Sequence, residues 1–131
     1  MSTLLVDHDI AGQVWLVWGA LAAEGWLELC PRERVTFVQV GFPADSGDRT
    51  VWRFAQAPGM VLLTHHRNRN DADSLEQTIR EENTPTSLPG ITLSRAERLR
   101  ARTDRERCVV RLSEIALEIE QYLGTGRLFI P

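Results

Sequence analysis

The chain contains no lysine, so all 15 of its basic residues are arginines. With 18 acidic residues its formal net charge is −3, which gives no general attraction to nucleic acid. Seven of the arginines fall between Arg95 and Arg111, where Glu97, Asp104 and Glu106 lie among them. Interspersed opposite charges are typical of a solvated helix face, so we expect surface ion pairs there. A phosphate-contacting edge is the alternative.

Long apolar runs are also missing. The longest, from Val14 to Leu21, is interrupted by Gly19 and is far shorter than the roughly 20 residues that span a bilayer. The first residues lack the basic-then-apolar layout of a signal peptide. The two cysteines, Cys30 and Cys108, have no metal-ligand spacing and stand in apolar contexts, which favours buried thiols. We therefore expect a cytoplasmic protein that does not enter a membrane.

Length and composition predict one globular domain over residues 1–131. The chain is 43% hydrophobic and 25% charged, which is ordinary for a folded domain of this size. A core of that size needs no disulfide or structural metal. The sequence has no nucleophile elbow, paired-cysteine zinc motif or phosphate-cradling glycine loop, and Gly124-Thr125-Gly126 follows a helical pattern, the wrong context for a dinucleotide site.

Strand-like and helix-like segments alternate along the chain. Strands are predicted at Thr3–Val6, Val35–Val40, Met60–Leu63, Gly90–Leu93 and Leu128–Ile130. Helices are predicted at Ile10–Glu24, Asp48–Gln56, Ser74–Glu82 and Asp104–Leu123. This order predicts an α/β fold, a three-layer sandwich with a mainly parallel central sheet and right-handed crossovers.

Ionisable residues gather where the predicted strands end, which is where open parallel sheets bind ligands. All three histidines and six of the 18 acids lie there, within Asp7–Asp9, Asp45–Asp48 and Thr64–Asp73. Carboxylates brought together repel one another unless a cation or protons neutralise them. Oxygen ligands favour Mg²⁺ or Mn²⁺, and a bound metal lowers the pKa of a water for attack on a phosphate. Alternatively, Asp7 only ends a strand, Asp48 only caps a helix, and Thr64–Asp73 is a solvated loop.

Two segments carry a resemblance to a known family. Leu4–Asp7 is similar to the opening strand of PIN-like domains, in which an acid ends the first strand. Asp48–Gln56, running into Gly59–Thr64, resembles the family's block of acid, amphipathic helix, apolar strand and threonine. The nearest likeness is to the shortened PIN-like group of bacterial proteins often found in toxin–antitoxin settings. The resemblance covers about two thirds of the chain and implies a PIN-like fold and metal-dependent cleavage of RNA with Mg²⁺ or Mn²⁺.

The resemblance is incomplete at the site. Asp7 and Asp48 match two of the family's metal-binding acids. The third acid, expected just after the strand-ending threonine, is missing, and His65 and His66 stand in its place. A fourth acid has no convincing match. Either the fold is kept without nuclease activity, or a histidine binds a softer metal, or an acid from the following loop completes the site.

Three functions follow. The first is a metal-dependent ribonuclease, as the toxin of a toxin–antitoxin pair, whose site residues are Asp7 and Asp48 as catalytic metal ligands, His65 and His66 as further metal ligands, and Arg67 and Asn68 as substrate contacts. Its partners are RNA and an antitoxin protein. The second is a catalytically inactive binding or assembly module in which surplus tryptophans form a homo-oligomer surface or a partner groove, namely Trp15, Trp18, Trp26 and Trp52. The alternative is that all four tryptophans belong to the core. The third is a small-molecule phosphohydrolase that uses the same metal site.

Overall fold

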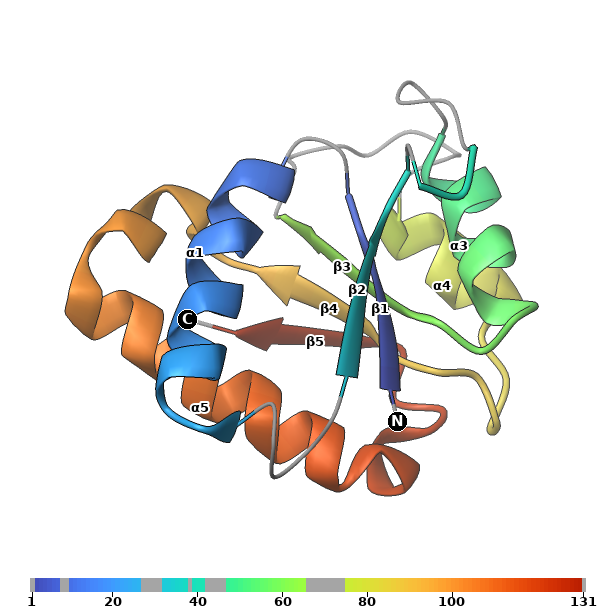
Figure 1. Ribbon diagram of the computed structural model, residues 1–131. Coiled ribbons are helices and arrows are strands. Elements are labelled where there is room, and N and C mark those ends of the chain that lie inside the picture. Colours follow the sequence, from blue (N-terminus) through green and yellow to red (C-terminus); the bar gives the residue numbers. More distant parts are fainter. Residues whose placement is uncertain are drawn as a thin grey trace.

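The computed structural model describes residues 2–7, 10–26, 32–37, 39–41, 47–65 and 75–130 (Figure 1). Its strands are β1 (Ser2–Val6), β2 (Arg32–Thr36), β3 (Val61–His65), β4 (Gly90–Leu93) and β5 (Arg127–Ile130). Its helices are α1 (Ala11–Ala23), α3 (Asp48–Gln56), α4 (Leu75–Glu82) and α5 (Arg102–Leu117), with short 3-10 helices at Ala96–Arg100 and Ile119–Tyr122. The predicted alternation of strands and helices is confirmed.

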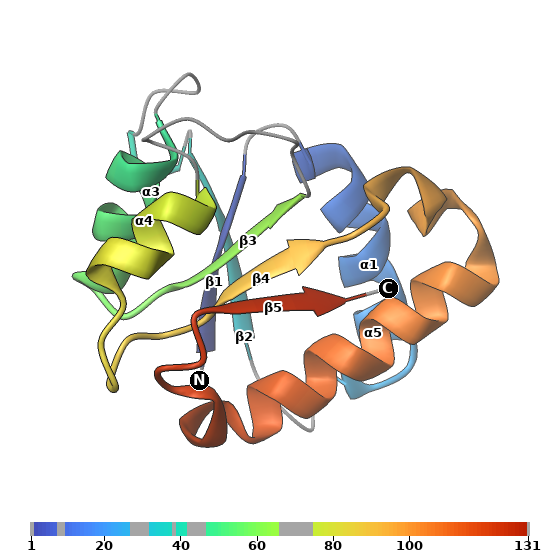
Figure 2. The same cartoon turned by 180° about the vertical axis from the view of Figure 1, so that it is seen from behind.

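The five strands form one parallel sheet in the order β2-β1-β3-β4-β5. Its central strands, β1 and β3, are buried on both faces, including Leu4–Val6 and Val61–Leu63. Strands covered on both faces are continuously apolar rather than alternating, as these two segments are. Helices lie on either side of the sheet (Figures 1 and 2). The predicted three-layer sandwich with a parallel central sheet is therefore confirmed.

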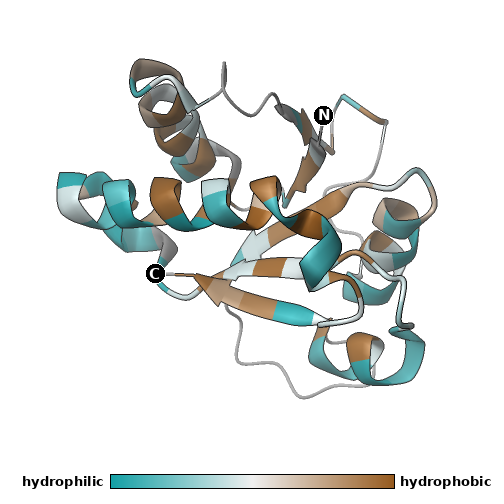
Figure 3. Cartoon of the chain, turned by 90° about the horizontal axis from the view of Figure 1, so that it is seen from below, coloured by the Kyte–Doolittle hydropathy of each residue, from teal (hydrophilic) through white to brown (hydrophobic). Residues whose placement is uncertain are grey.

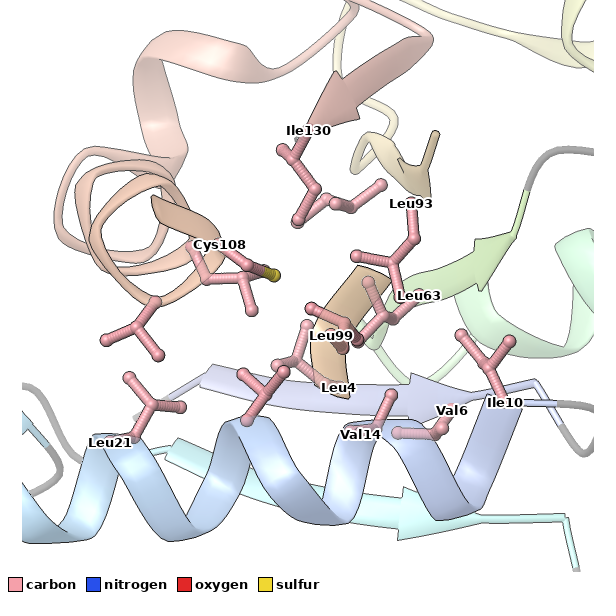
Figure 4. Close-up of a cluster of buried hydrophobic side chains, with 14 of the residues drawn as sticks. Leu4, Val6, Ile10, Val14, Leu21, Leu63, Leu93, Leu99, Cys108 and Ile130 are labelled. Atoms are coloured by element: carbon pink, nitrogen blue, oxygen red, sulfur yellow. The ribbon is translucent and has the colours of Figure 1, made fainter. Parts of the chain in front are cut away.

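Helices α1 and α5 cover one face of the sheet, here called the α1/α5 face. Its core takes side chains from four strands and both helices; Figure 4 shows Leu4, Val6, Ile10, Val14, Leu21, Leu63, Leu93, Leu99, Cys108 and Ile130 gathered there. Cys108 is fully buried, and burial raises the pKa of its thiol to about 12. The predicted buried thiol is confirmed for Cys108, whereas Cys30 lies outside the described residues.

Helices α3 and α4 cover the opposite face, here called the α3/α4 face. Trp52 of α3 and Leu75 of α4 pack there against Leu5 and Leu62 of the central strands. Ion pairs join the outer sides of the two helices, from Arg49 to Glu81 and Glu82 and from Arg53 to Glu82. The hydrogen bond from Arg53 lowers the pKa of Glu82. Hydrophobic contacts at the sheet and charges at the rim thus fix both helices over β1 and β3.

The last crossover differs from the others in hand. Helix α5, between β4 and β5, packs on the same face as α1, whereas α3 and α4 pack on the other. The steps from β2 to β3, β3 to β4 and β4 to β5 all move the same way across the sheet, and the step from β1 to β2 moves back. Three connections are right-handed as predicted, and β4–α5–β5 is left-handed (Figures 1 and 2), unlike about 98% of such crossovers.

The apolar side chains of β4 and β5 account for this reversal. Ile91, Leu93 and Ile130 all point to the α1/α5 face and are buried there. The α3/α4 face of the same strands carries Thr92 and Arg127, which hydrogen-bond to each other. A right-handed crossover would place α5 over these polar groups and leave the three apolar side chains without a helix to cover them.

The prediction for the second strand was wrong in its position. Strand β2 begins at Arg32 and ends at Thr36, so it starts earlier than expected and is largely charged. It is an edge strand that pairs with β1 in register, and charged residues are common on such edges. After it the chain turns, because the backbone N–H of Thr36 donates to Gln39 and the backbone N–H of Gln39 donates to the Thr36 hydroxyl. At Phe37, Gln39 and Val40 the chain therefore forms a turn where the strand was predicted to continue.

Three other boundaries were wrong. Strand β3 runs on through Thr64 and His65, which were expected to open the following loop. Helix α5 ends at Leu117 rather than Leu123, because Glu118 leaves the helical conformation and a 3-10 turn follows. Helix α1 begins after Ile10, which makes no side-chain cap hydrogen bond.

Within the ranges given above, no helix is long and apolar enough to cross a membrane. This finding agrees with the short apolar runs in the sequence.

A substitution at Gly126 tests how closely this residue packs against α4. Gly126 has a φ of +89°, and a Cβ there would lie 2.9 Å from Cγ2 of Ile79. We expect Gly126→Ala to lower the free energy of unfolding by about 2–4 kcal/mol, from left-handed backbone strain plus overpacking. Gly25→Ala is the matched control in urea denaturation, because Gly25 has a φ of +78° with no heavy atom near its Cβ position. Equal losses in the two variants would show that the Ile79 contact relaxes freely.

Candidate functional site

The strand order makes the carboxyl ends of β1 and β3 the candidate position for a ligand. These neighbours lead in opposite directions, since the chain leaves β1 for β2 on one side and leaves β3 for β4 on the other. In open α/β sheets, ligands bind outside the carboxyl ends of the strands at this kind of switch point. Asp7 directly follows β1, and Thr64 lies near the end of β3. Two polar residues therefore lie at this switch point of the sheet.

Asp7 is held firmly at this position. Its residue is only 6% exposed, and its Oδ2 accepts a 2.7 Å hydrogen bond from the Thr64 hydroxyl. Its backbone N–H donates to the carbonyl of Leu63, and its carbonyl accepts from the N–H of Ile10, at the start of α1. Because Asp7 alternates with Leu5 along the chain, its side chain lies on the α3/α4 face. Asp7 is therefore held by hydrogen bonds of both its backbone and its side chain.

Asp48 lies at the same edge of the sheet. It is the first residue of α3, which follows β2 and runs back along the α3/α4 face. Its Oδ2 accepts a 3.0 Å hydrogen bond from the backbone N–H of Leu75, the first residue of α4. A carboxylate at a helix N-terminus is favourable because the helix dipole is positive there. Asp48 therefore has a structural role in joining α3 to α4, and it shares both edge and face with Asp7.

His65, one of the two predicted histidine ligands, is placed differently. In the register of β3 and β4, His65 pairs with Leu93, whose side chain is buried in the α1/α5 core. The side chain of His65 therefore leaves β3 on the face opposite to those of Thr64 and Asp7. His66, Arg67 and Asn68 lie outside the described residues. Over the part of the chain that the structure describes, no group of three His, Cys, Asp or Glu residues could hold a metal ion.

The sequence did not single out Arg127, which lies on the same face as the two aspartates. Its Nε donates a 2.9 Å hydrogen bond to the hydroxyl of Thr92, and its guanidinium carbon lies 4.8 Å from the ring centre of Phe129. Burial lowers the pKa of Arg127, while the charges of Glu76 and Asp48 act in the opposite direction. The guanidinium is thus close enough to the first turns of α3 and α4 to interact with their acids.

Four polar residues form a row across the sheet on the α3/α4 face, here called the polar row: Asp7, Thr64, Thr92 and Arg127. Thr64 and Thr92 are partners in the β3–β4 register, and each hydroxyl bonds to the charged residue beside it. The polar row has an acidic residue, Asp7, at one end and a positively charged residue, Arg127, at the other. Such a surface can hold a bound cation near Asp7 and contact an anionic group through Arg127. The signal in the sequence was a polar residue within or directly after each of four strand segments that are otherwise largely apolar.

Comparisons of the chain with protein-family models, with curated proteins and with solved structures found no match.

The hydrogen bond between Thr64 and Asp7 can be tested by a double-mutant cycle. Thr64→Val keeps the shape of the side chain but removes the donor to a buried carboxylate, so we expect a loss of about 1–3 kcal/mol in the free energy of unfolding. In an Asp7→Asn background the same change should cost less, because a hydrogen bond to a charged acceptor is the stronger one. Urea denaturation of the four proteins measures the coupling. Additive losses would mean that the negative charge of the acceptor does not strengthen this hydrogen bond.

The link between Asp48 and α4 gives a separate prediction. Asp48→Ala removes the acceptor at the start of α4 and should lower the free energy of unfolding by about 1 kcal/mol, the usual cost of a lost helix cap. Asp48→Asn keeps an acceptor oxygen and should lose clearly less. Thermal and urea unfolding compare the two variants. A loss as large in Asp48→Asn as in Asp48→Ala would assign the effect to the charge and not to the hydrogen bond.

Proposed function

We propose that the carboxyl edge of β1 and β3 is the site of a metal-dependent ribonuclease of PIN-like type. The observation that supports this most directly is the position of Asp7 and Asp48, which extend from one edge and one face of the sheet. Aspartates on different faces could not share a cation. Their common placement is the condition that the resemblance to PIN-like domains requires.

The described donors fit a hard divalent cation in kind but not in number. Carboxylate oxygens are the ligands that Mg²⁺ and Mn²⁺ favour, and Asp7 and Asp48 would supply them. The third acid of the family is replaced by His65 and His66, so the site is degenerate. When bound, the cation would polarise the phosphate and lower the pKa of a water molecule. We therefore expect weak binding of Mg²⁺. Because His65 lies on the opposite face, only His66 would add an imidazole, which would favour Mn²⁺.

The protein's own groups would orient the substrate. Asp7, fixed by Thr64 and by two backbone hydrogen bonds, loses little freedom when it binds a cation. Arg127 lies on the same face and would donate to a phosphate oxygen of RNA. Arg67 and Asn68 are further proposed contacts from the loop after β3. An antitoxin protein that covers this edge would block access of RNA.

A second function, that of an assembly or binding module without catalysis, is supported by Trp15. This tryptophan is 65% exposed on α1, although an indole on a helix of a small domain is normally covered. Trp52, by contrast, is buried in the core, and Trp18 and Trp26 pack against the core with part of their surface exposed. The exposed ring offers a contact for a protein partner or for a second copy of the chain.

Cleavage of a labelled single-stranded RNA by the purified protein in Mn²⁺ tests the ribonuclease proposal. Asp7→Asn and Asp48→Asn keep the side-chain shape but each remove a ligand charge. We expect each to reduce the rate by more than the 10–100-fold that follows from changes in the outer shell of a metal site. Both variants keep an acceptor oxygen for Thr64 and Leu75 respectively, so their folding should be close to that of the unaltered protein.

Glu114→Gln is the matched control, because Glu114 is an exposed acid on α5 that pairs with Arg111 away from the site. It should cleave at the unaltered rate. Cleavage that persists in EDTA, or an Asp7→Asn protein that cleaves as fast as the control, would exclude the proposed site.

A further inference from the structure

Helix α1 is apolar on every side. Of its 13 residues only Gln13 is polar, and none is charged. One side is buried in the α1/α5 core through Ile10, Val14, Val17 and Leu21. A helix that is apolar all round is normally covered all round. Figure 3 shows the contrast between this largely brown helix and α5, whose teal and brown residues alternate.

The side of α1 that faces away from the core is exposed. Six residues at helical spacing make up this side, here called the outer α1 face: Gly12, Trp15, Leu16, Gly19, Ala22 and Ala23. Trp15 is 65% and Leu16 39% exposed, and neither has a polar neighbour within the face. Continuous exposed apolar patches on soluble domains mark interaction sites. We propose that the outer α1 face binds the same face of a second copy of this chain, with the two helices antiparallel.

The sizes of the side chains favour a second copy as the occupant. The bulky residues Trp15 and Leu16 stand in the first half of the face, and the second half holds only Gly19, Ala22 and Ala23. Over Gly19, no heavy atom lies within 4 Å of an ideal Cβ, so the space above it is open. A two-fold axis between Val17 and Trp18 places residue 16 of one copy opposite residue 19 of the other. Each bulky half then fills the open half of its partner.

The charges at the border of the face favour the same arrangement. Arg34 of β2 stacks on the Trp15 ring, with its guanidinium carbon 4.3 Å from the ring centre, and so lies near the first half of the helix. Glu24 caps the other end, where a carboxylate is unfavourable because the helix dipole is negative there. Antiparallel docking brings Glu24 of one copy toward Arg34 and the N-terminal end of α1 in the other. Parallel docking would bring like charges together.

This inference rests on the second proposed function and goes beyond it by naming the occupant and its orientation. One helix face buries less than the roughly 800 Å² per partner of a typical stable complex. The dimer is therefore weak, with a dissociation constant on the order of micromolar. It does not involve the carboxyl edge of the sheet, so it is independent of RNA cleavage.

Sedimentation equilibrium over a range of protein concentrations tests the dimer with Gly19→Leu. An ideal Cβ at this position has no heavy atom within 4 Å, and leucine favours the helix more than glycine, so the monomer should melt at a higher temperature than the unaltered protein. In the dimer it occupies the space for Leu16 of the second copy, so the dissociation constant should rise by at least about tenfold. Non-specific hydrophobic association would instead increase, because the variant is more apolar.

Two further variants separate this interface from other surfaces. Val110→Leu enlarges an exposed apolar residue on α5 and should leave dimerisation unchanged. Glu24→Arg should weaken the dimer, and adding Arg34→Glu should restore part of the loss. A monomer at all concentrations, or a dimer that Gly19→Leu leaves intact, overturns the inference. In the second case assembly would proceed through another surface, and the outcome of the RNA-cleavage assay would remain unaffected in both.

Discussion

Burial of the two central strands on both faces is the constraint on which the architecture depends. Every side chain of Leu4–Val6 and Val61–Leu63 must be apolar, because helices cover the sheet from each side. Polar groups can enter only at the strand ends, and there they must find partners. The hydrogen bond from Thr64 to Asp7 meets this requirement at the switch point of the sheet. The candidate site is therefore built from the polar groups nearest to the core.

The same requirement decides which helices cover β4 and β5, the two strands at one side of the sheet. Strands β4 and β5 are apolar toward α1 and α5 but polar toward α3 and α4. The left-handed crossover follows from this sidedness, since the statistical preference for a right-handed connection is weaker than the cost of exposing Ile91, Leu93 and Ile130. On the α3/α4 face of β5 Phe129 remains 53% exposed. The polar row thus remains accessible at that end.

The sequence predicted those elements whose pattern reflects burial. The apolar runs of β1, β3 and β4 and the helices α1 and α3 were found close to their true bounds. Strand β2 was misplaced because pairing with β1, and not its own hydropathy, makes Arg32–Thr36 extended. Asp7 was recognised as a strand-ending acid, but its pairing with Thr64 depends on which strands are neighbours. Arg127 was missed for the same reason, since its partner Thr92 is distant in sequence.

Packing of α1 against α5 has a consequence for the nascent polypeptide. Helix α1 leaves the ribosome before α5 is made, because it precedes α5 by most of the sheet. Until then Leu4, Val14 and Leu21 lack the cover that Cys108, Val109 and Leu112 later provide. A partly synthesised chain therefore presents both sides of α1 to the solvent, its inner side transiently and its outer side in the finished monomer as well. Such a helix is a natural binding site for chaperones during translation.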